Sequence, residues 1–309
     1  MAQRSQSRFA GRPGTDTRVH RDTSSDAITS KDNKWLKMFR AALQGTGPGE
    51  GEPLGVEGPK LVEEGVRSGL EVEALLVGDS GERPLEQILR VAGETEAGIP
   101  RSRILRTTDK LFAGVAGTEA PQGIAALFRQ HKWEFDDVLC GAATREGALK
   151  GGTPLVVVMA GIQDPGNVGT ILRSAEAFGA TGVIATRGTA DPWSPKALRA
   201  SAGSALRLPL VRGMAIPVVL AQLRMARIKI YAASARTIPD SNPPVASTAD
   251  LREPSAIFIG SEGAGLPPEV EHAADARVSI PINATVESLN AGVAAAVILY
   301  EAARQRKLV

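Results

Sequence analysis

The chain has 309 residues, a formal net charge of only +2, 4% aromatic residues and one cysteine, Cys140. This length suggests about two domains, and a single cysteine excludes an internal disulfide framework and suits a reducing compartment. The sequence has neither an apolar run of membrane-spanning length nor the apolar core of a signal peptide, so we expect a cytoplasmic protein.

The first 30 residues are polar and basic. They hold five of the nine Lys and Arg residues in the first 40 positions and almost no large apolar side chain. Such a segment cannot bury enough surface to offset the entropy of ordering, so we predict a disordered tail over 1–30. The tail could contact RNA phosphates without sequence preference, or it could only improve solubility.

Residues 31–129 alternate between helical and strand patterns, which predicts a small α/β domain. The patterns indicate helices at 32–43 and 59–68, strands at 72–77 and 124–128, and a loop rich in Gly, Pro and Glu at 45–58. Residues 130–152 are polar, with one small apolar cluster, and indicate an interdomain linker.

The second half, 153–309, is organised around 155–184. An unbroken apolar run at 155–159 is typical of a strand buried on both faces of a parallel sheet. A turn follows, and then apolar residues at helical spacing, with Asn167 in the position of an N-cap and Gly179 at the C-terminal end. Because 181–185 is apolar again, the segment predicts a βαβ unit.

The rest of this half continues the alternation. Strands are expected at 208–211, 228–233, 256–259 and 278–280, and helices from Ser194-Pro195, over 216–225, from Pro268 and over 289–303. The fold class is therefore α/β, with a parallel sheet in the second domain.

Two polar residues of the central helix are candidates for ligand binding. Asn167 and Arg173 would flank the cleft above the carboxyl end of the strand, where open α/β sheets bind ligands. They could equally be a capping amide and a solvated cation. The glycine-rich turn at 260–265 does not fit the dinucleotide fingerprint, and the three histidines show no metal-ligand spacing, so no metal site is expected.

Three motifs together resemble the SpoU/TrmH family of RNA ribose methyltransferases. They are NVGTILR at 167–173, IGSEGAGL at 259–266, and Ile280-Pro281 followed by VESLN at 286–290. The resemblance is close over 153–304. It is looser in the front domain, where 56–65 and 118–123 resemble a substrate-binding domain similar to small ribosomal RNA-binding proteins. An ordinary α/β domain without a role in RNA binding remains the alternative there.

The resemblance implies a deep trefoil knot that holds S-adenosylmethionine in a bent shape. It places cofactor contacts at Gly260, Ile280, Ser288 and Leu289. The family usually has a glycine where this chain has Ala284, which could narrow the third-motif loop.

The resemblance also places the catalytic residues at Asn167, Arg173, Glu262, Ser288 and Asn290. Arg173 would activate the ribose hydroxyl. A guanidinium is normally protonated, so a bidentate grip on a phosphate fits its chemistry better, and the proton acceptor stays open. Glu262 would pair with a cation or cap the next helix, and Asn290 could be only the N-cap of the last helix.

The stretch 194–203 resembles the part of the family that faces RNA, which implies contacts from Lys196, Arg199 and Ser201. A solvated basic helix face is the alternative. The implied activity is methylation of a ribose 2′-hydroxyl, in ribosomal RNA ahead of transfer RNA. An inactive RNA-binding assembly factor is the rival. The resemblance and the apolar final helix also predict a homodimer through the second domain.

Overall fold

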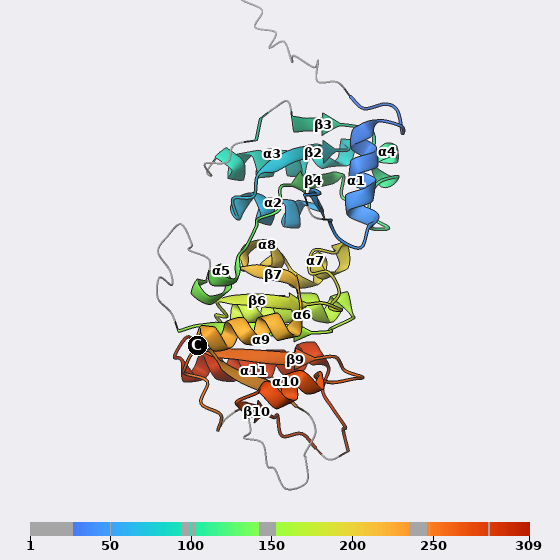
Figure 1. Ribbon diagram of the computed structural model, residues 1–309. Helices are drawn as coiled ribbons and strands as arrows, with labels where there is room; N and C mark the ends of the chain where they lie inside the picture. The colour runs from blue at the N-terminus through green and yellow to red at the C-terminus, as the bar shows by residue number, and fades with distance from the viewer. Residues whose placement is uncertain are drawn as a thin grey trace, which may run out of the picture.

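The computed structural model describes residues 27–49, 51–93, 99–100, 103–141, 153–234, 246, 248–283 and 285–309. The predictions for most of the tail and for Ala284 therefore lie outside the described residues. The chain forms two α/β domains stacked end to end (Figure 1). No helix within the described ranges combines the length and the apolarity needed to span a membrane.

The N-terminal domain is a four-stranded sheet covered on both faces. Its strands are β1 (Leu54–Glu57), β2 (Val72–Val77), β3 (Ile104–Arg106) and β4 (Ile124–Phe128), in the order β1-β4-β2-β3. The helices α1 (Lys34–Gln44) and α4 (Asp109–Ala113) cover one face. The helices α2 (Pro59–Arg67) and α3 (Glu82–Gly93) cover the other face, and a 3-10 turn, η1 (Asp79–Gly81), precedes α3.

Two predictions for this domain were wrong. The stretch 45–58 is not all loop, because β1 lies at its end and pairs antiparallel with β4. The predicted disordered tail 1–30 extends too far, because Ile28 is buried and accepts a hydrogen bond from Thr107 Oγ1 at 2.9 Å. In both cases a few apolar residues find partners that are distant in sequence, and composition alone does not reveal such partners.

The predicted linker contains a helix, α5 (Phe135–Cys140). Its Val138 is completely buried against the sheet of the second domain, and Gly182 lies so close that an added Cβ would be 2.7 Å from Val138 Cα. The second domain therefore includes α5.

The second domain is built on a six-stranded sheet in which every described strand pair is parallel. The strand order is β10-β8-β9-β5-β6-β7. The strands are β5 (Leu155–Ala160), β6 (Gly182–Thr186), β7 (Leu210–Met214), β8 (Lys229–Ala233), β9 (Ser255–Gly260) and β10 (Ala276–Val278). The chain runs outward from β5 to β7 and then crosses to β8, so β5 and β9 meet at the point where the strand order reverses.

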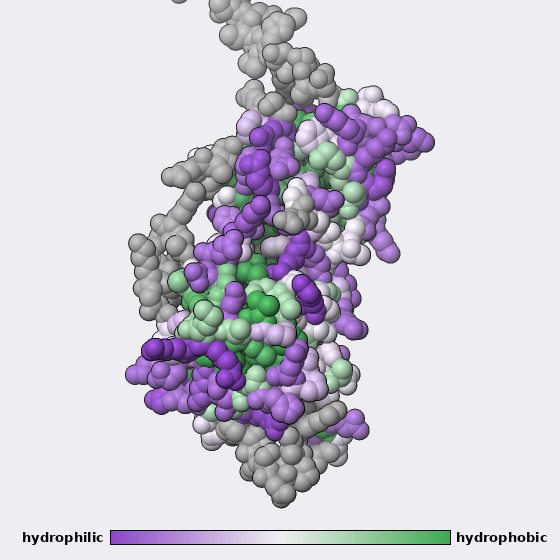
Figure 2. All heavy atoms as spheres, viewed as in Figure 1, coloured by the Kyte–Doolittle hydropathy of each residue, from purple (hydrophilic) through white to green (hydrophobic). Residues whose placement is uncertain are grey.

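Helices cover both faces of this sheet. One face packs against α5, α9 (Ile216–Met225) and α10 (Pro268–Ala273). On this face, apolar side chains remain visible over β6, β7 and α9 (Figure 2). The other face packs against α6 (Pro165–Ala177), α7 (Pro195–Ser201), α8 (Ser204–Arg207) and α11 (Ala291–Gln305).

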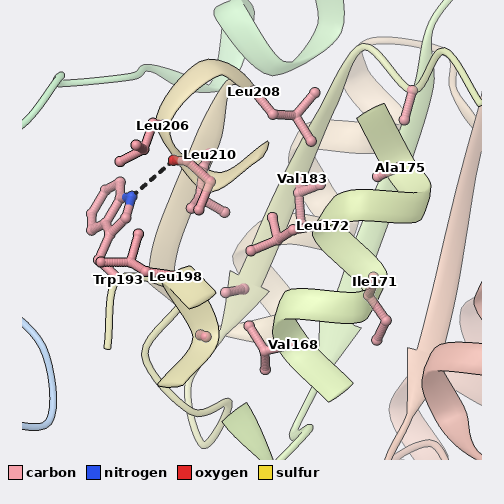
Figure 3. Close-up of a cluster of buried hydrophobic side chains, with 14 of the residues drawn as sticks. Val168, Ile171, Leu172, Ala175, Val183, Trp193, Leu198, Leu206, Leu208 and Leu210 are labelled. Atoms are coloured by element: carbon pink, nitrogen blue, oxygen red, sulfur yellow. Dashed lines mark hydrogen bonds between the residues drawn. The ribbon is translucent and has the colours of Figure 1, made fainter. Parts of the chain in front are cut away.

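The core beneath α6 anchors the segment that faces the N-terminal domain (Figure 3). Val168, Leu172 and Leu198 are buried there, and Trp193 Nε1 donates a hydrogen bond of 3.1 Å to the Ala205 carbonyl. This contact fixes α8 against the loop before α7. The helices α6, α7 and α8 thus form one packed unit.

Candidate active site

Three residues that are far apart in the sequence form a hydrogen-bonded cluster. Asn167 and Asn290 both donate through Nδ2 to Glu262 Oε1, at 2.9 and 2.6 Å. Asn290 Nδ2 is also 2.9 Å from Asn167 Oδ1. We call these residues the amide–carboxylate cluster. It brings the three sequence motifs together at the point where the strand order reverses, which is where open α/β sheets bind ligands.

Asn167 reaches the cluster from the first turn of α6. The prediction that Asn167 is the N-cap was wrong: α6 begins at Pro165, with Asp164 as N-cap. Proline suits the first helical position because its missing N–H would have no partner there. The helix therefore starts three residues earlier than predicted, and Asn167 lies in its first turn, where it faces Glu262.

Asn290 is both a helix cap and a member of the cluster. Its Oδ1 accepts from the backbone N–H groups of Gly292 and Val293 at 3.0 and 3.2 Å, while its Nδ2 binds Glu262. Glu262 Oε1 accepts from Ala291 N at 3.2 Å. The carboxylate thus sits at the N-terminus of α11, which favours negative charge. Among the described residues, Glu262 contacts the two asparagines and the start of α11, and neither a cation nor the start of α10.

Arg173 lies apart from the cluster. It is six residues beyond Asn167 on α6, which is roughly 9 Å along a helix. Its side chain is exposed, and within the described ranges no hydrogen bond or ion pair is formed by its guanidinium. An exposed guanidinium with no carboxylate partner can bind an incoming phosphate.

The expected cofactor residues follow β9 and β10. Gly260 ends β9 in a tight turn: an added Cβ would lie 2.4 Å from the carbonyl group of Gly265, so only glycine fits. Ile280 lies two residues beyond the end of β10, not inside the strand as predicted, and is half-buried. Leu289 is also half-buried and Ser288 is exposed, directly before Asn290.

These residues fit an adenosine-containing cofactor. The side chains of Ile280 and Leu289 are apolar, and the turn at Gly260 leaves the backbone uncovered by any side chain of its own. Apolar surfaces combined with a few backbone donors and acceptors are typical of small-molecule sites. The hydrogen bond from Ala291 N to Glu262 connects the loop of the second motif to the residue that follows the third motif.

A cleft of about 730 Å³ opens between the two domains beside α6. From the second domain, Pro165, Lys196 and Arg199 line it, and from the N-terminal domain, Gln44, Thr46 and Glu119. Lys196 Nζ is 2.7 Å from Asp164 Oδ1. The hydrogen bond and the charge of Lys196 lower the pKa of Asp164. Nothing in the sequence indicated Asp164, because its partner is 32 positions away.

Ser201 does not face this cleft. It is fully buried, donates through Oγ to the Leu198 carbonyl at 2.8 Å and accepts from Ala205 N. We therefore correct the prediction that Ser201 contacts RNA: its hydroxyl stabilises the turn between α7 and α8. Lys196 and Arg199 are the members of the predicted set that line the cleft.

Comparisons with known proteins match both domains of the chain. The model of the "SpoU rRNA Methylase family" matches residues 154–300, and that of the "MRM3-like substrate binding domain" matches residues 52–126. A Bacillus subtilis protein named 23S rRNA (guanosine(2553)-2′-O)-methyltransferase RlmP is 30% identical over 251 residues, covering 79% of this chain and 86% of that protein.

Solved structures also match along most of the chain. The SpoU methyltransferase AviRb from Streptomyces viridochromogenes, in complex with the cofactor AdoMet, has a TM-score of 0.73 and 28% identity. The match covers 89% of this chain and 98% of AviRb. An rRNA methyltransferase from Sinorhizobium meliloti has a TM-score of 0.73 and 27% identity, covering 90% of this chain and 97% of that one.

Proposed function

The chain belongs to the SpoU family of RNA methyltransferases, and we infer that it transfers a methyl group from S-adenosylmethionine to a ribose 2′-hydroxyl of RNA, with ribosomal RNA favoured. The observation that carries this inference is the amide–carboxylate cluster. Each of the three family motifs contributes one residue to it, and Asn167, Glu262 and Asn290 are in direct contact.

We propose that Gly260, Ile280, Ser288 and Leu289 hold the cofactor, whose sulfonium group supplies an activated methyl. The amide–carboxylate cluster fixes the two loops that carry these residues. Preorganised loops hold the reacting groups close together and correctly oriented, which is the main contribution a protein makes to such a transfer. A trefoil knot in this region stays a prediction from the family resemblance.

For Arg173 we propose a grip on the phosphate beside the target ribose. Its guanidinium is exposed and, within the described part of the chain, has no carboxylate to neutralise it. A guanidinium has no free lone pair to accept a proton, so its role here is to bind and not to remove the hydroxyl proton. A phosphate held by Arg173 could accept that proton while its negative charge is stabilised.

The interdomain cleft is our candidate for the RNA path. It lies beside the start of α6, and Lys196 and Arg199 carry positive charge into it. RNA must reach the methyl-transfer site as an accessible nucleotide, and loops and ends of RNA offer these. Ribosomal RNA is favoured because the Bacillus subtilis relative is named as a 23S rRNA methyltransferase. Transfer RNA remains the alternative, and a cytoplasmic location stays a prediction.

We also propose that two copies pair through α11 and α6. Val293, Val297 and Tyr300 are exposed at 47%, 39% and 49%, and their spacing puts them on one side of α11. Tyr300 contacts Phe178, at the C-terminal end of α6, edge to face, with ring centroids 5.8 Å apart. A second copy on this surface would bring its Arg173 toward the cofactor loops, as the family resemblance implies.

The direct test of the function is methyl transfer to RNA. Ribosomal and transfer RNA from cells that lack the gene would be incubated with the purified protein and radiolabelled S-adenosylmethionine. We expect label in ribosomal RNA, at a single ribose, with resistance to alkaline cleavage after that nucleotide. Label only in transfer RNA would change the substrate class. Cofactor binding without transfer to either RNA would favour the inactive assembly factor.

A further inference from the structure

Arg207, at the end of α8, connects the two domains. Its Nε and Nη2 donate to the two carboxylate oxygens of Glu176 at 2.6 and 2.8 Å. Its Nη1 donates to Glu64 Oε2 at 2.5 Å. Glu176 lies on α6, and Glu64 lies on α2 of the N-terminal domain. We call these three residues the interdomain triad.

The triad is largely shielded from water. The side chains of Arg207, Glu64 and Glu176 are 33%, 30% and 31% exposed. Burial alone would raise the pKa of Glu176, but hydrogen bonds from Arg207 and Ser204 outweigh it and leave the pKa lowered. Both carboxylates therefore depend on a single guanidinium, and removing Arg207 would leave two negative charges facing each other.

The interdomain triad is connected to the methyl-transfer site through one rigid helix, α6. Glu176 is three residues beyond Arg173 on α6, and the same helix carries Asn167 into the amide–carboxylate cluster. The positive φ of Gly203, at +92°, lets the chain turn between α7 and α8 where it meets Glu64. The orientation of α2 is thus coupled to the helix that carries the predicted catalytic arginine.

We propose that Arg207 is a positioning residue that holds the N-terminal domain at a fixed orientation over the methyl-transfer site, so that RNA long enough to contact both domains is bound in register. This inference deepens the proposed function and rests on it. Because all three guanidinium nitrogens of Arg207 donate to these two carboxylates, we do not count Arg207 among the residues that contact RNA phosphate.

The kinetic test compares Glu64→Gln and Arg207→Gln with the wild type. The substrates are full ribosomal RNA and the shortest trimmed fragment of it that still accepts a methyl group. For full RNA we expect KM to rise about tenfold in Glu64→Gln and further in Arg207→Gln, with kcat within about twofold. KM for the short fragment should not change.

Glu63→Gln is the matched control. Glu63 is the neighbouring residue on α2, but its partner is Arg67 on the same helix, 2.8 Å away. The Glu63→Gln substitution removes the same charge without changing the contact between the domains, so KM should stay at the wild-type value. We expect the KM of the double variant Glu64→Gln, Arg207→Gln to be no higher than that of Arg207→Gln alone. The reason is that both substitutions break the same contact between Glu64 and Arg207.

A second measurement works without any methyl transfer. Cys140 is the chain's only cysteine and is exposed on α5 of the second domain, and Met38→Cys would add a second label site on α1, where Met38 is 38% exposed. The labelled protein would be diluted with unlabelled protein, and the efficiency of energy transfer between the dyes at the two sites would be measured. We expect one narrow distribution of transfer efficiencies in the wild type. We expect Glu64→Gln and Arg207→Gln to broaden it and Glu63→Gln to leave it unchanged.

The outcomes separate the two levels of inference. An inactive wild type with a broadened Glu64→Gln distribution refutes the methyl-transfer proposal, and with it the role of Arg207 in RNA methylation, but shows that Arg207 still holds the two domains at a fixed orientation. An active wild type with unchanged KM and an unchanged distribution in Glu64→Gln overturns the positioning role. Equal losses on full and short RNA would also overturn it, since Arg207 would then support only the fold of the second domain.

Discussion

Asn290 combines a cap and a site contact in one side chain, and a substitution can separate them. Asn290→Ser keeps an oxygen that can cap α11 but loses the Nδ2 donor to Glu262 and Asn167. We expect the free energy of unfolding to change by less than about 0.5 kcal/mol, while methyl transfer falls at least roughly tenfold. Thermal unfolding and a transfer assay measure the two effects. Full activity in this variant would leave Asn290 with the cap alone.

Arg173 should matter for chemistry and not for folding. Its side chain is exposed and its helix is held by other residues. We expect Arg173→Ala to lower kcat by about 100-fold or more, the loss typical when a charged group that acts in the transition state is removed. Calorimetry should show unchanged affinity for S-adenosylmethionine. Arg173→Lys, which keeps the charge but not the bidentate geometry, should recover only part of the rate. Near-normal turnover in Arg173→Ala would remove it from the mechanism.

The structure brings together three residues that the sequence motifs predicted for one site, but the sequence did not predict what each of them contacts. Motif order placed Asn167, Glu262 and Asn290 in one site, but not the hydrogen bonds among them. The prediction for Ser201 was wrong because its side chain lies on another side of α7 than that of Lys196. It is five residues from Lys196, so it points about 140° away from that lysine around α7, into the core.

At the scale of elements, the contact between α6 and α7 depends on a glycine. A Cβ on Gly169 would lie 2.5 Å from both the Ala197 carbonyl oxygen and Ala200 Cβ. We expect Gly169→Ala to force the helices apart and to lower the free energy of unfolding by about 2 kcal/mol. Gly93→Ala, at the end of α3 with open space around it, is the control and should be neutral or slightly stabilising. Chemical denaturation distinguishes them, and equal stability of both variants would contradict tight packing here.

The predicted element bounds were most accurate where local pattern and packing agree. The predicted strands 72–77 and 124–128 and the helix 216–225 coincide with β2, β4 and α9. The strand β1 was missed because its Leu54-Gly55-Val56 stretch follows a segment rich in Gly, Pro and Glu. Gly55 allows α1 to approach closely, since a Cβ there would lie 2.6 Å from Ala42 Cβ, and only the folded domain reveals this contact.

For the whole molecule, RNA affinity should depend on salt through the residues that line the cleft. Neutralising phosphates releases counterions, so affinity falls as salt rises, with a slope of about one per phosphate contact. We expect Lys196→Ala and Arg199→Ala each to reduce this slope by about one. Arg252→Ala removes a cation paired with Asp250 outside the cleft and should not change it. Filter binding at several salt concentrations tests this, and equal slopes in all three variants would contradict an RNA path through the cleft.

The proposed dimer can be tested by adding one charge to the exposed stripe of α11. Ile298, on the same helix, is unsuitable for this test because its side chain is only 1% exposed and belongs to the core of the subunit. Val297→Lys should instead give a folded monomer with little activity, because a buried lysine without a partner is costly. Val218→Lys, at a similarly exposed valine on α9, should remain dimeric. Sedimentation of the wild type as an active monomer would contradict pairing.

The helix α1 has a practical consequence for any shortened form of this protein. The family models match from residue 52 onward, but α1, which precedes that point, contributes Leu36, Phe39 and Leu43 to the core. A fragment cut at the matched boundary would leave Ala74, Leu76 and Leu127 uncovered on the sheet. Such an apolar surface promotes aggregation, so a truncation meant to stay monodisperse should begin before Ile28.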